Sequence, residues 1–287
     1  MTMTEPWENE RKLVETTKEP ITKKRLVEDL YDAGVRPGDT VIVHSSMKSI
    51  GWIVGESVTV IEALMEAVSK EGTLVMPTQT TGNGEPSRWQ APAVPEEWWD
   101  IIRTEMPPYD PVTSPTRKMG IISETFRKYP EVYRSAHPQA SFAAWGKNAK
   151  LVVKTHPLDD VFGQASPLAK LYDLDAKILL IGIGLNANTS LHHAEFRANL
   201  PDMPRVKLGA AILEKGKRKW ATWEQPDYND DDFPRIAEEY EKHAGLSRVY
   251  IGQAESHIFS MRELVDFAVN WMKENRVYDG DELTWIT

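Results

Sequence analysis

The stretch Lys177–Pro201, KILLIGIGLNANTSLHHAEFRANLP, gives the strongest indication of the fold. Its run Ile178–Ile181 is continuously apolar and is followed by glycines, which is typical of a central strand buried on both faces of a sheet. The polar residues at 188–190 are of the types that cap helices, and Pro201 stops helix propagation. The pattern therefore predicts a buried strand, a short polar turn and then a helix.

The predicted helix carries two adjacent histidines and a glutamate. His192 and Glu195 are three residues apart and share one helix face, whereas His193 projects about 100° away. A histidine in a first helical turn feels the positive end of the helix dipole, which favours the neutral imidazole. Because a neutral imidazole oriented by a carboxylate suits a general base, His192 is a candidate catalytic residue. A purely capping or packing role for His192 is the alternative on these residues alone.

Composition narrows the class of protein. The chain has 287 residues, no cysteine and a formal net charge of -9. The lack of cysteine excludes disulfides, thiolate metal sites and an acyl-cysteine intermediate. The acidic balance argues against nucleic acid and favours neutral or cationic partners. Residues 1–20 form a polar arm without the apolar core of a signal peptide or membrane span, so we expect a soluble cytoplasmic protein with no membrane partner.

The first two thirds of the chain alternate predicted strands and helices. The strand Thr40–Val43 opens into the Ser- and Gly-containing loop 44–55, and a helix is expected over about 57–69. A strand, a loop and a helix start can cradle a phosphate through backbone amides, although an ordinary connection is the alternative. Hairpin strands appear only late, at 206–223. The order predicts a mixed sheet with helices on both faces.

One long segment interrupts this alternation. Residues 80–112 are rich in proline and tryptophan, and a loop of this length inside a compact domain is usually a lid or a binding wall. The alternative is an insertion packed on the surface by its own tryptophans. No linker is evident elsewhere, so we expect one domain over 21–287 that carries this lid-like segment. A further helix is expected to start at Ser114–Thr116.

Three motifs are absent or incomplete. The run Gly182–Ala187 matches G-x-G-x-x-A, but the acidic residue that a dinucleotide site needs on a following strand is missing. The chain has no G-x-S-x-G nucleophile turn and no H-E-x-x-H zinc motif. We therefore expect no metal.

Six motifs in consistent order carry a resemblance to a known family. They are VHSSMKSIGWIVG (43–55), GTLVMPT (72–78), SPTRKMG (114–120), RSAHPQASFAAWG (134–146), FGQASPL (162–168) and NTSLHHAEFR (188–197). With them the chain resembles the aminoglycoside N3-acetyltransferase family, which is distinct from the GNAT acetyltransferases. The resemblance extends from Thr22 to about Trp271. It implies a three-layer α/β/α sandwich around a mixed, largely parallel sheet, acetyl-CoA as cosubstrate and a cationic aminoglycoside as acceptor.

The resemblance also implies roles for particular residues. His192 matches the catalytic histidine, and His44 lies near the transfer site. The family has one acid six residues before the histidine, where this chain has Asn186, and a second after the late hairpin. Glu224 is favoured for that second acid, with Asp227 next and Glu195 available from the helix itself. His137 is expected to hold its own loop by hydrogen bonds.

The implied binding residues fall into two sets. Those expected to line the coenzyme are His44, Ser45, Ser46, Met47, Ser49, Gly51, Ser114, Thr116 and Phe162. Those expected to meet the cationic substrate are Glu96, Trp99, Glu224 and Asp227.

The expected reaction is acetyl transfer from acetyl-CoA to the 3-amino group of an aminoglycoside, direct and in a ternary complex. A transient acyl-serine at Ser45 or Ser46 is an alternative route. Two other functions stay open: a CoA-dependent acyltransferase that acts on a non-antibiotic amine, and a CoA-binding protein weakened in catalysis by Asn186. The assembly is expected to be a monomer or a homodimer.

Overall fold

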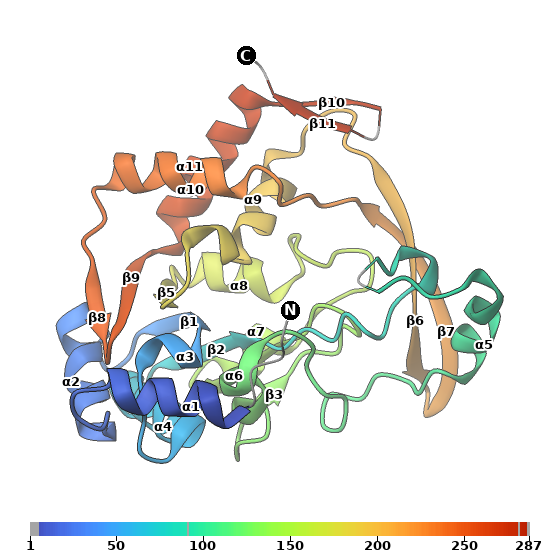
Figure 1. Ribbon diagram of the computed structural model, residues 1–287. Helices are drawn as coiled ribbons and strands as arrows, with labels where there is room; N and C mark the ends of the chain where they lie inside the picture. Colours follow the sequence, from blue (N-terminus) through green and yellow to red (C-terminus); the bar gives the residue numbers. More distant parts are fainter. Residues whose placement is uncertain (1–5, 91, 281, 286–287) are drawn as a thin grey trace.

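The computed structural model describes residues 6–90, 92–280 and 282–285 (Figure 1). Residues 1–5 of the expected N-terminal arm lie outside the described residues, as do residues 91, 281 and 286–287 of the expected domain. The rest of the expected arm contains a helix, α1 (Pro6–Thr16), where the sequence analysis expected only a loose polar segment.

Seven strands form the central sheet, in the order β3-β4-β2-β1-β5-β9-β8. Their bounds are β1 (Thr40–Ser45), β2 (Thr73–Pro77), β3 (Tyr133–Arg134), β4 (Phe142–Gly146), β5 (Lys177–Ile181), β8 (Val249–Ile251) and β9 (Ala254–Ser260). Strand β1 pairs in parallel with β2 and β5, and the flanking pairs are antiparallel. The predicted mixed sheet is confirmed, with its parallel strands at the centre.

Helices cover both faces of this sheet (Figure 1). One face carries α2 (Lys23–Ala33), α3 (Met47–Ile50), α4 (Glu56–Val68) and α6 (Gly120–Phe126). The other carries α7 (Ala149–Val153), α8 (Pro167–Asp173), α9 (Ser190–Ala198), α10 (Phe233–Ala244) and α11 (Met261–Asn275). Among the described helices, none combines the length and apolar character needed to cross a bilayer.

The alternation of side chains along β5 connects the two cores. Ile178 and Leu180 pack into the core under α8–α11, whereas Leu179 and Ile181 pack into the core under α2 and α4. Successive side chains of a strand point to opposite faces, so a continuous apolar run is required when both faces are covered. The three-layer α/β/α sandwich is confirmed.

Within the described residues, two hairpins lie outside the central sheet. The first consists of β6 (Arg205–Glu214) and β7 (Lys217–Pro226), as the sequence predicts. The second consists of β10 (Arg276–Asp279) and β11 (Glu282–Trp285). It follows α11 and was not predicted.

The segment 80–112 is fixed to the first hairpin. It contains the short helices η1 (Pro86–Arg88), η2 (Glu96–Trp98) and α5 (Trp99–Glu105). Asn83 exchanges two hydrogen bonds of 3.1 Å with the backbone of Ala211, whose carbonyl also accepts from the Tyr109 N–H at 2.8 Å. The Arg218 Nε donates to the Met106 carbonyl at 2.9 Å. Figure 1 accordingly shows α5 beside β6 and β7 rather than over the sheet.

Candidate active site

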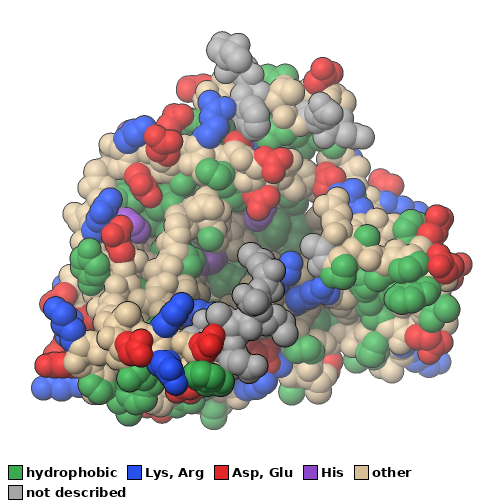
Figure 2. Space-filling view, viewed as in Figure 1, with side chains coloured by type: hydrophobic (Ala, Val, Ile, Leu, Met, Phe, Trp, Pro, Cys, Tyr) green, Lys and Arg blue, Asp and Glu red, His purple; other side chains and the backbone are tan. Residues whose placement is uncertain are grey.

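A cavity of about 340 Å³ opens at the carboxyl ends of β1, β2 and β5. This edge of a parallel sheet is where α/β proteins usually bind ligands. Its lining includes His44 and Ser45 of β1, Pro77 of β2, Lys118 and Met119 before α6, Asn186 of η3 (Leu185–Ala187), His192 of α9, and Asp230. Figure 2 shows the surface hollowed between the part that carries α9–α11 and the part that carries the first hairpin.

His192, which lines this cavity, forms a hydrogen-bonded pair with Glu195, which lies behind it and does not line the cavity. The His192 Nδ1 lies 2.5 Å from the Glu195 Oε2. The carboxylate accepts, so Nδ1 carries the proton and Nε2 is the ring nitrogen left for a proton from a bound molecule. The His192 side chain is 20% exposed whereas that of Glu195 is fully buried. The arrangement suits proton abstraction from a molecule in the cavity.

The other Glu195 oxygen is also occupied. Its Oε1 accepts from Arg276 Nη1 at 2.6 Å and from the Asn229 N–H at 3.0 Å. Arg276 in turn forms two hydrogen bonds with the carboxylate of Asp232, and all three charged side chains are fully buried. Burial alone would lower the pKa of Arg276, but its pairing with Asp232 and Glu195 raises that pKa above its ordinary value. The sequence analysis missed Arg276, since no local pattern connects it to a helix 81 residues earlier.

Aromatic rings enclose the imidazole. The ring of Phe162 stacks on His192 with centroids 4.7 Å apart, and Phe233 contacts it at 4.9 Å. The Phe162 carbonyl accepts from the Nδ1 of His193 at 2.7 Å. Burial lowers the pKa of His193 to about 4, so this second histidine is neutral. It faces away from the cavity, and its role is to hold the backbone of Phe162.

Of the expected coenzyme loop 44–55, only His44 and Ser45 line the cavity, and both belong to the end of β1. Burial lowers the pKa of His44 to about 4, and its Nε2 has no hydrogen-bond partner among the described residues. Ser45 also lines the cavity. Of the remaining expected coenzyme residues in this loop, Ser46, Met47, Ser49 and Gly51 do not line it. Ser49 donates to Ser46 Oγ at 2.9 Å, and Gly51 is packed against Gln253 with a positive φ of 105°.

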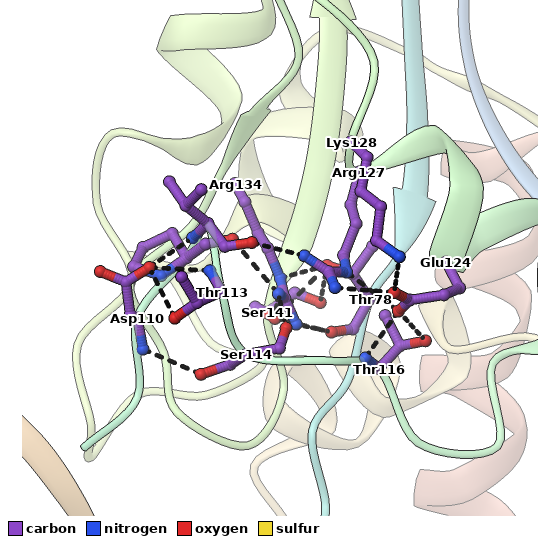
Figure 3. Close-up of polar contacts among 12 residues, drawn as sticks. Thr78, Asp110, Thr113, Ser114, Thr116, Glu124, Arg127, Lys128, Arg134 and Ser141 are labelled. Carbon is purple, nitrogen blue, oxygen red and sulfur yellow. Dashed lines mark hydrogen bonds and ion pairs between the residues drawn. The ribbon is translucent and has the colours of Figure 1, made fainter. Parts of the chain in front are cut away.

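Ser114 and Thr116 belong to a polar network beside the cavity (Figure 3). The Glu124 carboxylate accepts from the Thr116 N–H at 2.8 Å and from its hydroxyl at 2.9 Å. The Ser114 carbonyl accepts from Arg134 Nη1 at 2.5 Å. These bonds hold residues 114–116 in an irregular conformation, so the helix expected there begins only at Gly120. Neither residue lines the cavity, but the loop they anchor continues into Lys118 and Met119, which do.

The structure does not pair Glu224 with His192. Glu224 is exposed on β7, between the buried Trp223 and Gln225. Because strand side chains alternate, a residue between two buried neighbours faces solvent. That alternation is visible in the sequence and could have excluded Glu224. The partner is Glu195, three residues from the histidine on the same helix.

The other expected acidic and polar partners also differ from expectation. Asp227 forms an ion pair with Arg88 at 2.9 Å and does not contact His192. Asn186 lines the cavity, but no hydrogen bond joins it to His192, whose Nδ1 is bound to Glu195. Glu96 is exposed on η2, and Trp99 lies under the Arg103 guanidinium at 5.8 Å. Neither Glu96 nor Trp99 lines this cavity. Asp230 is the acid that does.

No group of three or more His, Asp or Glu side chains within the described residues is arranged to hold a metal ion. The histidine–carboxylate pair at the strand ends is instead typical of an enzyme that uses general base catalysis.

Comparison with known proteins identifies the family. The family model for aminoglycoside 3-N-acetyltransferase matches residues 42–273. The SPbeta prophage-derived aminoglycoside N(3')-acetyltransferase-like protein YokD of Bacillus subtilis (strain 168) is 43% identical over 266 residues, covering 92% of this chain and 97% of the relative. Aminoglycoside N(3)-acetyltransferase VII of Streptomyces paromomycinus is 38% identical, covering 93% and 96%. The chain belongs to the aminoglycoside 3-N-acetyltransferase family.

Solved structures agree with this assignment. The crystal structure of YokD from Bacillus subtilis aligns with a TM-score of 0.89 at 42% identity, over 92% of this chain and 98% of that one. AAC-VIa bound to sisomicin aligns with a TM-score of 0.81 at 32% identity, over 89% and 98%. AAC-IIIb in a binary complex with CoASH aligns with a TM-score of 0.80 at 29% identity, over 89% and 97%.

Proposed function

We propose that this protein transfers the acetyl group of acetyl-CoA to the 3-amino group of an aminoglycoside, with His192 as the general base. The observation that carries the proposal is the 2.5 Å bond from His192 to the buried Glu195, which turns the other ring nitrogen into a proton acceptor within an open cavity. Family membership supports the reaction, and the relatives solved with CoASH and with sisomicin support the two substrates.

The proposed chemistry is a direct transfer in a ternary complex. Aminoglycoside amines are largely protonated near neutral pH, and only the free amine attacks a thioester. As its nitrogen bonds to the carbonyl carbon, the bond from carbon to sulfur breaks and CoA leaves as a thiolate. The nitrogen's proton passes to Nε2 of His192, and the Glu195 carboxylate stabilises the imidazolium that forms. General base catalysis of this kind contributes about 10²–10⁴-fold to the rate.

Residues around the cavity have supporting roles in this proposal. Asp230 supplies a negative charge for the cationic acceptor, and Lys118 supplies a positive charge for the phosphates of acetyl-CoA. His44 and Ser45 lie at the end of β1, where a neutral histidine can donate or accept a hydrogen bond without adding charge. Phe162 holds the ring plane of the base.

Thiol release from acetyl-CoA in the presence of sisomicin tests the proposal directly. Sisomicin already acetylated at N3 is the matched control acceptor and should release no thiol above background. NMR of the product should place the new acetyl group on the 3-amino nitrogen. His192→Gln should be inactive yet still bind CoA in isothermal titration, whereas His193→Gln should retain measurable transfer. Transfer to simple amines but not to sisomicin would overturn the proposed acceptor. CoA binding without transfer to any amine would overturn the proposed acetyltransferase activity.

A further inference from the structure

We infer that Arg276 is a positioning residue that couples the His192–Glu195 pair to the acidic loop 227–232, and that its charge sets the pH range over which His192 accepts a proton. The inference rests on the proposed function, because it assumes that His192 is the base. Arg276 lies at the start of β10, outside the segment that the family model matches.

The guanidinium uses all three of its nitrogens. Nη1 donates to Glu195 Oε1 at 2.6 Å, while Nε and Nη2 donate to the two oxygens of Asp232 at 2.6 and 2.5 Å. Nη2 also donates to the Asn229 carbonyl at 2.8 Å. Only the planar fork of arginine satisfies two carboxylates and a carbonyl together, since lysine offers a single nitrogen.

Arg276 is also connected to the cavity through the loop 227–232. The Asn229 N–H donates to the same Glu195 oxygen at 3.0 Å, so the loop, Glu195 and Arg276 close a ring of hydrogen bonds. The next residue, Asp230, lines the cavity with His192. Arg276 therefore fixes both the partner of the base and the carboxylate that faces the acceptor.

The charge of Arg276 also acts on the base. Glu195 shares its negative charge between the imidazole and the guanidinium, so the imidazolium is stabilised less than it would be by an unpaired carboxylate. Without the guanidinium, Glu195 and Asp232 both favour the protonated ring. The other titratable groups that surround His192 are His44, Lys118, Tyr228 and Asp230. His44 and Lys118 lie on other elements, whereas Tyr228 and Asp230 belong to the loop that Arg276 holds through Asn229. Arg276→Lys keeps the charge but loosens this loop, so it separates the effect of the charge on His192 from the effect of loop movement.

The test compares Arg276→Gln and Arg276→Lys with the control Arg262→Gln. Arg262 is an exposed arginine on α11 that binds the carbonyls of Tyr172 and Asp173. Histidine-labelled protein is titrated by NMR, with the His192 signal assigned by its loss in His192→Gln. The pH dependence of kcat/KM is measured with acetyl-CoA and sisomicin. Folding is checked by circular dichroism.

In Arg276→Gln, the titration midpoint of His192 and the acidic limb of the rate profile should both move up by about 0.5–1 pH unit. Arg276→Lys keeps the charge, so the titration midpoint of His192 should stay near that of the parent. KM for sisomicin should rise, because a lysine cannot make all the hydrogen bonds by which the guanidinium holds loop 227–232. The control Arg262→Gln should change neither the titration midpoint of His192 nor KM for sisomicin.

An unchanged midpoint in folded Arg276→Gln overturns the inference. If that variant does not fold, an unchanged KM for sisomicin in Arg276→Lys overturns it. The NMR titration does not depend on turnover, so it still tests the coupling if the parent protein proves unable to acetylate sisomicin. Failure of the inference in an active parent would leave the proposed function standing.

Discussion

The rings of Phe162 and His192 lie only 9° from parallel, with centroids 4.7 Å apart. Together with the Glu195 hydrogen bond, this stack fixes both the plane and the rotation of the imidazole. The loop that carries Phe162 is held in turn by His193, whose Nδ1 binds the Phe162 carbonyl. The two adjacent histidines therefore have different surroundings: His192 lines the cavity, and His193 holds the backbone of the residue whose ring stacks on His192.

Loss of the stack should lower the rate more than it weakens binding of the acceptor. We expect Phe162→Leu to reduce kcat about 10-fold, because a base held in a less defined orientation reaches the reactive geometry less often. Steady-state kinetics with both substrates separates kcat from KM. Phe196→Leu is the matched control, since Phe196 stacks on His193 rather than on His192. Equal losses in both variants would contradict the role of the stack.

The acid that supports the base should be Glu195 and not Glu224. Glu195→Gln removes the charge that stabilises the imidazolium, and we expect a loss of about 10²-fold or more in kcat/KM. Glu224→Gln changes an exposed side chain on β7 and should stay within about twofold of the parent, as surface substitutions usually do. The comparison requires both variants to be folded by circular dichroism. A large loss in Glu224→Gln with an active Glu195→Gln would reverse this assignment.

Asp230 should matter for the acceptor and not for acetyl-CoA. A charge-assisted hydrogen bond contributes about 1.5–3 kcal/mol, so Asp230→Asn should raise KM for sisomicin about 10-fold or more. KM for acetyl-CoA should stay within about twofold, as expected where no such contact is lost. Asp231→Asn is the control, because Asp231 is an exposed neighbour of Asp230 that does not line the cavity. An increase in both KM values would mean that Asp230 supports the cavity rather than the amine.

Acid should destabilise the fold through its buried histidines. His137 is fully buried, its Nδ1 accepts from the N–H groups of Gln139 and Ala140, and its Nε2 donates to the Leu158 carbonyl. Burial lowers the pKa of His137 from 6.5 to about 4. The unfolded chain therefore takes up this proton below about pH 6.5 while the folded chain does not, so stability falls as the pH decreases from 6.5 towards 4.

Urea unfolding at pH 7.5 and 4.5 measures this contribution. The free energy of unfolding should decrease less between these values in His137→Gln than in the parent, by about 2–3 kcal/mol. His243→Gln, which changes an exposed histidine on α10, should leave the decrease as it is. A parent and a His137→Gln variant with equal pH dependence would refute the assignment.

The sequence predicted those parts of the fold that local patterns encode. The apolar run of β5 and the hairpin, predicted at 206–223 and found at 205–226, both depend on residues a few positions apart. The helix expected at Ser114 was displaced to Gly120 because Arg134 and Glu124 bind that segment from elsewhere in the chain. Tertiary hydrogen bonds of this kind leave no periodic pattern in the segment they hold.

The residues of the site also divide into those that local spacing predicts and those that only long-range contacts bring together. The spacing of His192 and Glu195 was enough to place both on one helix face, and their pairing follows from helix geometry. The choice of Glu224 came from the resemblance, which gave a region and not a residue. Arg276 could not be predicted at all, because its contacts with Glu195 and Asp232 exist only after α11 has brought β10 back to α9.

The anchoring of segment 80–112 on the first hairpin constrains how this protein can be re-engineered. The backbone N–H and carbonyl of Ala211 both depend on Asn83, and the same carbonyl also receives the Tyr109 N–H. Because every residue other than proline at position 211 presents the same backbone N–H and carbonyl, the side chain that matters is that of Asn83, and a chimera whose segment lacks an amide at position 83 would leave these two groups short of a partner. The two pieces are best transplanted as a single cassette on an unchanged α/β/α scaffold.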